Sequence, residues 1–161
     1  MVIIKVIRHS GSDLSYLQNM IAYVTDSRAI VSGALGLNPN NPSIAYEQMV
    51  AVKKYCKQMS MNPLVHIVVS LDGACNNQRA AVLIAPRIVA YFKDNYQLMW
   101  CVHAPDESSG HHWHIHILLN SVNVQNGHLF HSGPYEMNAF GYHVKQITDD
   151  SFNVRYECIH D

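Results

Sequence analysis

The segment from residue 111 to residue 120 alternates between polar and apolar side chains, and this pattern constrains the fold more than any other feature of the chain. It reads His-His-Trp-His-Ile-His-Ile-Leu-Leu-Asn. Successive side chains on a β-strand point to opposite faces, so the even-numbered residues share one face and the odd-numbered ones share the other. The odd-numbered, apolar face must be buried. The pattern therefore predicts a well-anchored strand that presents imidazoles in a row, from His112, His114 and His116.

This row of imidazoles predicts a metal site. Histidines two residues apart on a strand have Cα atoms about 6–7 Å apart, so two of them can converge on one ion. A third ligand must come from a neighbouring strand. His103 ends the preceding apolar segment, and a short hairpin connection would place it beside His114 and His116. Three imidazoles with open positions suit zinc, manganese or a similar divalent ion, and such sites polarise a carbonyl or phosphoryl oxygen.

Hydrophobic patterning along the chain predicts one α+β domain that spans residues 1–161. Strands are expected at 2–8, 64–71, 96–103, 111–121 and 152–158, and helices at 13–24, 42–59, 77–94 and 135–147. The stretch 31–41 is rich in Gly and Asn and is expected to form no regular element. Hairpin-like neighbours in the middle of the chain favour a mostly antiparallel central sheet of about five strands. Helices are expected to flank it and cover one face.

The charge balance limits how this chain can bind nucleic acid. It has 11 Lys and Arg residues against 12 Asp and Glu residues, for a net charge of -1. Proteins that bind nucleic acid usually show a basic balance. Any affinity for DNA must therefore come from local clustering, from the metal or from segments outside this chain. Lys53, Lys54 and Lys57 line one side of an expected helix, where a solvated face is the first expectation.

Cysteine usage and hydropathy indicate the compartment. The four cysteines form no Cys-x-x-Cys pair, and no stretch approaches the roughly 20 apolar residues that span a bilayer. We therefore expect a soluble cytoplasmic protein with reduced cysteines and no membrane partner.

The spacing of residues does not select a nucleophile among the nine tyrosines. A family resemblance does. His103 followed by His114-Ile-His116 resembles the HUH endonuclease signature, and the surrounding motifs resemble those of the relaxase/mobilization nuclease family of plasmids and integrative conjugative elements. These motifs are Ala22-Tyr-Val-Thr-Asp26, Val31-Ser-Gly33, His66-Ile-Val-Val-Ser70, His116-Ile-Leu-Leu-Asn-Ser-Val122 and Gly127-His-Leu-Phe-His131. The resemblance covers residues from about 14 to 131.

The resemblance implies a ferredoxin-like core with the metal site on its central antiparallel strands. The family's metal ligands fall on His103, His114 and His116, and its nucleophile at the end of the first helix falls on Tyr23. The family implies Mg or Mn as the divalent ion, while the ligand types leave Zn open. Many members carry an Asp soon after the first His. Here Ala104 and Pro105 intervene, and the nearest carboxylates and other supporting candidates are Asp106, Glu107, His112, Ser70 and Asn120.

The activity implied by the resemblance is that of a metal-dependent DNA strand transferase. Tyr23 would nick one strand at a transfer origin by transesterification, forming a 5′-phosphotyrosine link and a free 3′-OH. Its substrate would be single-stranded or locally melted origin DNA, and its partners accessory DNA-binding and coupling proteins. The base for the tyrosine remains open among His9, Asp106 and Glu107. Family members are usually longer, so the chain is expected to be an isolated or truncated N-terminal catalytic domain.

Two alternatives remain. HUH replication initiators and small transposases carry their tyrosine after the histidines, and Tyr142, with Lys145 one turn later on an expected helix, fits that arrangement. The low basic charge instead favours a non-cleaving, metal-binding DNA-recognition module.

Overall fold

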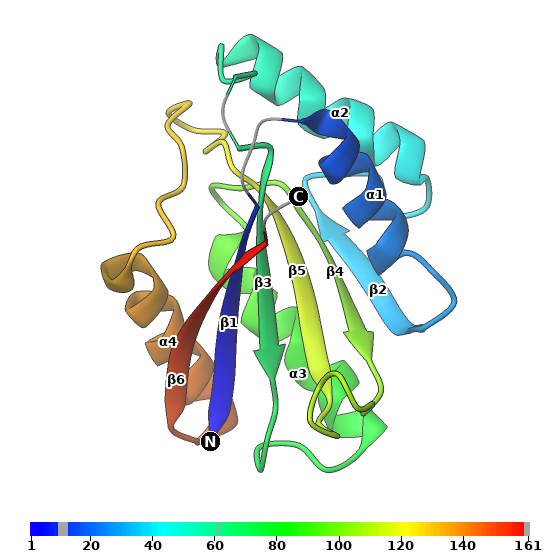
Figure 1. The fold of residues 1–161 in the computed structure, drawn as a ribbon, viewed down its shortest axis with the longest axis vertical. Coiled ribbons are helices and arrows are strands. Elements are labelled where there is room, and N and C mark those ends of the chain that lie inside the picture. The colour runs from blue at the N-terminus through cyan, green and yellow to red at the C-terminus, as the bar shows by residue number, and fades with distance from the viewer. Residues whose placement is uncertain (10–12, 61, 160–161) are drawn as a thin grey trace.

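The computed structural model describes residues 1–9, 13–60 and 62–159. A single sheet and four α-helices account for most of them (Figure 1). In chain order the elements are β1 (Val2–His9), α1 (Leu14–Val24), β2 (Ala29–Leu35), α2 (Pro42–Tyr55), β3 (Leu64–Ser70), α3 (Gln78–Val89), the 3-10 turn η1 (Ala90–Phe92), β4 (Leu98–His103), β5 (His114–Asn120), α4 (Pro134–Thr148) and β6 (Phe152–Ile159).

The sheet is mostly antiparallel, as the sequence predicted, and it confirms the α+β class. Its strand order is β2-β4-β5-β3-β1-β6, and only the β1–β6 pair is parallel. The sheet has six strands where about five were expected. The additional strand is β2, which occupies part of the Gly- and Asn-rich stretch. Gly33 allows β2 to approach β4 closely, because a Cβ atom there would lie 2.8 Å from the Trp100 indole.

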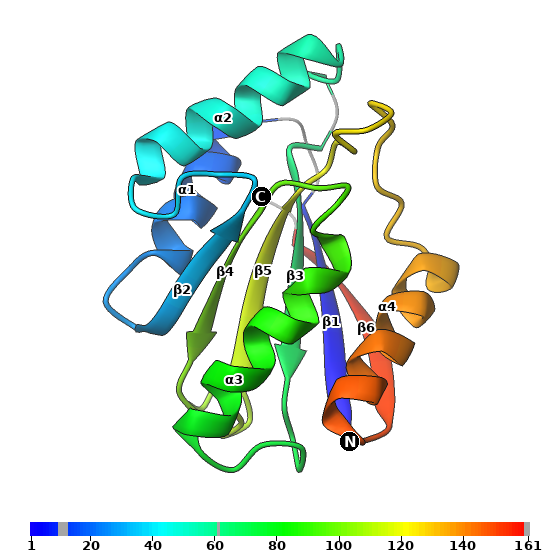
Figure 2. The ribbon, with the colours of Figure 1, turned by 180° about the vertical axis from the view of Figure 1, so that it is seen from behind.

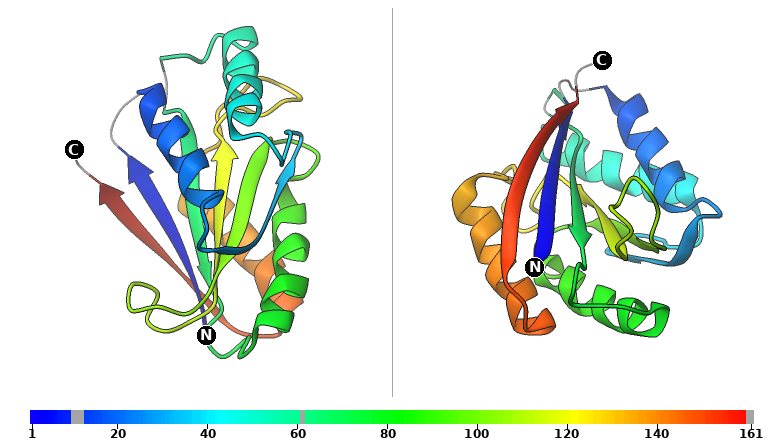
Figure 3. Two further views of the ribbon diagram at one scale, coloured as in Figure 1. Left: turned by 90° about the vertical axis from the view of Figure 1, so that its right-hand side faces the viewer. Right: turned by 60° about the horizontal axis from the view of Figure 1, so that its bottom comes forward.

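Helices cover both faces of the sheet, whereas one covered face was expected. α3 and α4 pack on the face formed by residues such as Ile4, Ile67 and Ile117 (Figure 2). α1 and α2 pack on the other face, against Met99, Cys101 and Leu118, so the two helix pairs lie on opposite sides (Figure 3). Every residue of the central strand β5 is therefore buried. The polar face of the alternating segment is buried under α1 and α2 at one end.

The placement of α1 determines what lies on this second face. Asp13 caps α1 by accepting a hydrogen bond from the Ser15 backbone N–H, and Leu17, Ile21 and Val24 form its buried side. α1 contacts β4 and β5 and thereby brings its last turn over these two strands. In the described part of the chain, no helix lies in front of the lower parts of β1 and β6 (Figure 1). The sheet is therefore open beside the end of α1.

None of the helices within the described ranges is long and apolar enough to cross a membrane.

Candidate active site

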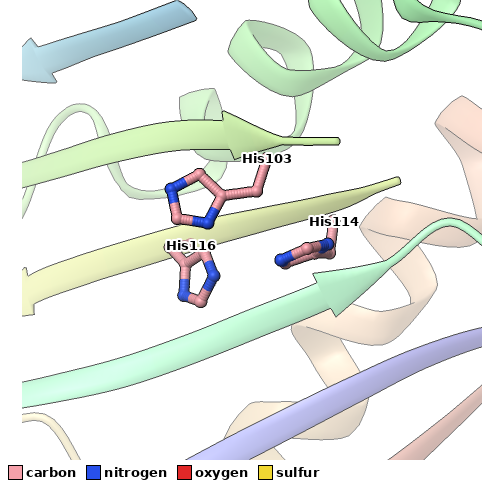
Figure 4. Close-up of side chains that lie close together, drawn as sticks. All are labelled: His103, His114 and His116. Atoms are coloured by element: carbon pink, nitrogen blue, oxygen red, sulfur yellow. The ribbon is translucent and has the colours of Figure 1, made fainter. Parts of the chain in front are cut away.

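Three buried histidines meet where β4 ends and β5 begins. His103 is paired with His114 across the two strands, and Cys101 is paired with His116. In an antiparallel pair, residues directly opposite each other point to the same face, so all three imidazoles project together (Figure 4). Each offers one nitrogen, and these three atoms lie within 4.8 Å of one another. The structure therefore brings together the three histidines that the sequence predicted as metal ligands.

Two of the rings have one nitrogen engaged by a neighbour. His114 Nδ1 donates a hydrogen bond to the His112 carbonyl oxygen at 3.0 Å, which leaves the lone pair of Nε2 available. His116 Nδ1 lies 2.9 Å from Nε2 of His66 on β3. Histidines that bind metals usually donate from their second ring nitrogen to a carboxylate, a backbone carbonyl or water, as His114 does here. These contacts hold the rings of His114 and His116 in fixed orientations.

The third ring and one buried atom complete the donor set. His103 Nε2 lies 3.3 Å from Cys101 Sγ, and burial raises the pKa of this thiol to about 12, so the sulfur stays protonated. Within residues 1–9, 13–60 and 62–159, the buried Nε2 of His116 has no hydrogen-bond partner. A buried nitrogen without a partner is unfavourable unless it binds a cation. The three histidines therefore fit a divalent metal ion.

Burial keeps the three rings neutral. It lowers the pKa of His103 and His114, with the positive charge of neighbouring groups adding to the effect on His103. The pKa of His116 falls to about 2, mainly by burial and then by the nearby His66. A neutral imidazole presents a lone pair, while a protonated one repels a cation. The ligand set is thus ready to bind metal at neutral pH.

Tyr23 lies against this cluster. Its ring centroid is 5.5 Å from that of His103 and 5.2 Å from that of His116, with both contacts edge-on. The side chain is half-buried in the last turn of α1. Burial raises the pKa of its phenol, and the charge of Arg28 opposes that rise. The structure thus brings the predicted nucleophile to the predicted metal ligands.

Arg28 is a site residue that the sequence analysis missed. Its guanidinium carbon lies 4.5 Å from the centre of the Tyr23 ring. Asp26 accepts hydrogen bonds from Arg28 Nε at 3.0 Å and from its terminal nitrogen at 2.7 Å. Both residues lie in the turn after α1, where no periodic pattern indicates which side chains point back to the helix.

A cavity of about 450 Å³ opens beside the histidines and extends across the uncovered part of the sheet. Tyr23, His114 and His116 line one end, and Lys5 and Arg155 line the end formed by β1 and β6. The exposed loop that precedes β5 closes one side of it. The open sheet face, His114 and His116 therefore form one continuous surface.

Of the supporting candidates, Ser70 and His112 lie at this cavity. Ser70 is paired with His114 across β3 and β5 and lines the wall. His112 also lines the wall, and its Nδ1 lies 3.7 Å from an oxygen of Asp72. It precedes β5, whereas the alternating pattern predicted it as a strand residue. The pairing of β5 with β3 and β4 begins at His114, and the backbone at His111 has a left-handed φ of 63°.

The two acidic candidates lie in the exposed loop between β4 and β5. The Asp106 carboxylate accepts hydrogen bonds from the Ser108 hydroxyl and the Ser109 N–H, which lower its pKa to about 2. A carboxylate with so low a pKa is a poor proton acceptor for a phenol. Glu107 is exposed in the same loop.

The structure does not bring Asn120 to the histidines. Asn120 lies at the far end of β5, where its Oδ1 accepts a hydrogen bond from Lys53 Nζ at 2.6 Å and its Nδ2 donates to Gln97 at 2.9 Å. Lys53 is only 1% exposed, so the expectation of a solvated face is wrong for this lysine. These polar groups satisfy one another in the interior.

Tyr142 and His9 also lie elsewhere. Tyr142 is 62% exposed on α4, which covers the opposite face of the sheet, and its ring contacts Phe152. His9 stacks on Tyr16 with ring centroids 3.9 Å apart and lines a different pocket.

Comparison with known proteins agrees with this geometry. The family model "Relaxase: MobA/VirD2-like, nuclease domain" matches residues 16–150, a range that contains Tyr23 and the three histidines. No curated protein and no solved structure matches the chain significantly. The family match spans most of the chain and implies a DNA endonuclease that acts on single strands. The chain therefore belongs to the relaxase family, as a MobA/VirD2-like nuclease domain.

Proposed function

We propose that this chain is a relaxase that nicks one DNA strand at a transfer origin by tyrosine transesterification. Tyr23 is the nucleophile, and His103, His114 and His116 hold a divalent ion. The observation that carries the proposal is the position of Tyr23. Its ring centroid lies 5.5 Å from that of His103 and 5.2 Å from that of His116, and Tyr23 lines the same cavity as His114 and His116.

A bound divalent ion would draw charge from the non-bridging oxygens of the scissile phosphate and stabilise the transition state. The chemistry of family members favours Mg or Mn, and three neutral imidazoles also suit Zn. The protein orients the metal ligands. Buried partners hold the histidine rings, and the guanidinium of Arg28 adds a positive charge at the Tyr23 ring.

The bonds balance in a single displacement. The Tyr23 phenolic oxygen forms a bond to phosphorus, and the bond from phosphorus to the 3′ oxygen breaks. The phenol loses its proton to water in the open cavity, and the departing 3′ oxygen takes up a proton to become a 3′-OH. The strand is left with a 5′-phosphotyrosine link, which keeps the phosphodiester available for resealing.

The bound strand would lie across the open face of β3, β1 and β6. Lys5 and Arg155 line this surface and suit phosphate groups, and Val68 of β3 lies between Lys5 and His116 in the sheet. The bases must be unpaired to lie flat on such a surface, so the substrate is single-stranded or locally melted origin DNA. Since the net charge is -1, accessory DNA-binding and coupling proteins would add to this local affinity.

The test is covalent capture of labelled single-stranded origin candidates in the presence of Mn²⁺. The wild-type chain should give a covalent product that migrates with the protein, and Tyr23→Phe or removal of metal with a chelator should abolish it. Tyr142→Phe should leave it intact. Loss of the product in Tyr142→Phe alone would identify the chain as an initiator or transposase. Metal binding without any product, across several origins, would identify a non-cleaving module.

A further inference from the structure

His116 faces another imidazole with the nitrogen that it does not offer to the cluster. His116 Nδ1 lies 2.9 Å from His66 Nε2, and the two rings stack with centroids 5.2 Å apart. Both side chains are buried, with 6% and 4% of their surface exposed. Between two imidazoles a hydrogen bond forms only when one nitrogen donates and the other accepts. The pair therefore has two possible directions.

The other nitrogen of His116 decides between these directions. A nitrogen that binds a cation must present its lone pair, so metal binding at Nε2 requires the proton to be on Nδ1. His116 Nδ1 must then donate, and His66 Nε2 must accept. In the opposite direction His116 would carry its proton on Nε2, a buried atom without a partner among the described residues. Burying a donor without an acceptor is unfavourable.

We propose that His66 is a positioning residue, which accepts a hydrogen bond from His116 Nδ1 and so directs the lone pair of His116 Nε2 toward the metal ion. This inference rests on the metal site of the proposed function. Metal-bound histidines usually donate to a carboxylate, a backbone carbonyl or water. A neutral imidazole in that place adds no negative charge to the ligand set. The full charge of the ion then remains available to the phosphate.

The first test uses the metal-free wild-type protein and needs no substitution. Selective ¹⁵N labelling of histidine with NMR detection of the ring nitrogens distinguishes a protonated Nδ1 from a protonated Nε2. The proposal expects the Nδ1-protonated form at His116 and an unprotonated Nε2 at His66. An Nε2-protonated His116 would overturn it.

The second test measures Mn²⁺ binding by electron paramagnetic resonance in the absence of DNA. His66→Leu, which cannot accept a hydrogen bond, should weaken binding by about 10–100-fold. His66→Gln, whose side-chain oxygen reaches nearly the same position, should restore most of the affinity, while the shorter His66→Asn should not. His143→Gln, at a half-buried position on α4 outside the cavity, is the matched control and should have no effect on Mn²⁺ binding.

Wild-type Mn²⁺ affinity in His66→Leu would contradict the proposal, as would equal losses in the Gln and Asn variants. If His66→Leu does not fold, the Mn²⁺ affinities of His66→Gln and His66→Asn still test the proposal, because both variants keep a polar side chain. Failure of the proposed function would give a different experimental result. The chain would then bind Mn²⁺ with its His66 dependence intact but form no covalent product with DNA.

Discussion

Arg28 lies over the face of Tyr23, with its guanidinium carbon 4.5 Å from the ring centre. Asp26 fixes it there, since one carboxylate oxygen accepts two bonds from the guanidinium and the other accepts the Arg28 backbone N–H at 2.8 Å. The turn after α1 therefore holds a positive charge beside the proposed nucleophile. A phosphate that approaches Tyr23 meets this charge in addition to the histidine cluster.

Replacing Arg28 should slow strand cleavage without weakening metal binding. Arg28→Ala removes a positive charge that lies next to the reacting groups, and we expect the single-turnover rate of adduct formation to fall by about 10–100-fold. Arg28→Lys keeps the charge but cannot form the paired contact with Asp26, so its rate should be intermediate. Arg87→Ala on α3 serves as the control. A wild-type rate in Arg28→Ala, or a loss of Mn²⁺ affinity, would show that Arg28 has another role.

The open face of β1 and β6 should contribute salt-dependent affinity for single strands. Lys5→Gln and Arg155→Gln should each weaken binding of a labelled oligonucleotide and reduce the slope of log affinity against log salt by about 0.7. Glu157 pairs with Lys5 at 3.0 Å, so Glu157→Gln should free this lysine and tighten binding. Arg79→Gln and Lys93→Gln, outside the cavity, should leave the slope unchanged. Equal slopes in all these variants would exclude this path for the strand.

The histidine cluster could be predicted because its signals lie along single strands. Alternation over residues 114–120 defines which side chains share a face, and a hairpin connection brings His103 beside His114. The residues at which a strand begins and ends are harder to predict from the sequence. Alternation alone includes His112 in the strand, while the pairing of β5 with β3 and β4 begins only at His114. The position of Tyr23 came from family resemblance, since α1 carries two tyrosines, Tyr16 and Tyr23, on similar helical faces.

Features that depend on packing between distant segments could not be predicted. The sequence did not predict β2 because it lies partly in a stretch rich in Gly and Asn, yet Gly33 is required by the Trp100 indole of the neighbouring strand. Lys53 reads as a surface residue because lysines are seldom buried. Its partners Asn120 and Ser121 lie more than 60 positions away in the sequence. Only the folded chain shows that these polar groups meet.

The burial of Lys53 should make stability depend on pH in the alkaline range. Burial lowers the pKa of Lys53 from 10.5 to about 8, so the charged form is disfavoured in the folded state. Below pH 8, Lys53 is protonated in both the folded and the unfolded chain. Between pH 8 and 10.5 only the unfolded chain retains it, so the free energy of unfolding should rise with pH, by about 3 kcal/mol over this window.

Urea unfolding at several pH values measures this rise against that of Lys53→Met, which lacks the titrating group. The stability difference between the two proteins should change over the alkaline window in favour of the wild type. Lys54→Met, an exposed neighbour on α2, should keep the wild-type dependence. A Lys53→Met curve parallel to that of the wild type would contradict the assignment of a lowered pKa to this lysine.

Gly141 should resist the substitution that usually stabilises a helix. Glycine within a helix is less favourable than alanine by about 1 kcal/mol, so Gly141→Ala on an isolated α4 would be stabilising. In the folded chain a Cβ atom at this position overlaps the ring of Phe152. Displacing a packed ring costs about 1–3 kcal/mol. We therefore expect Gly141→Ala to lower the free energy of unfolding, as measured in urea.

Two further variants separate packing from helix propensity. Ala139→Gly, at an exposed position of the same helix, should lower stability by about 1 kcal/mol through propensity alone. Combining Gly141→Ala with Phe152→Leu should show favourable coupling, because the smaller side chain leaves room for the new methyl group. An increase in stability for Gly141→Ala alone would contradict the close contact. Because Phe152 begins β6, the same contact holds the strand that carries Arg155, so Gly141→Ala should also weaken single-strand binding.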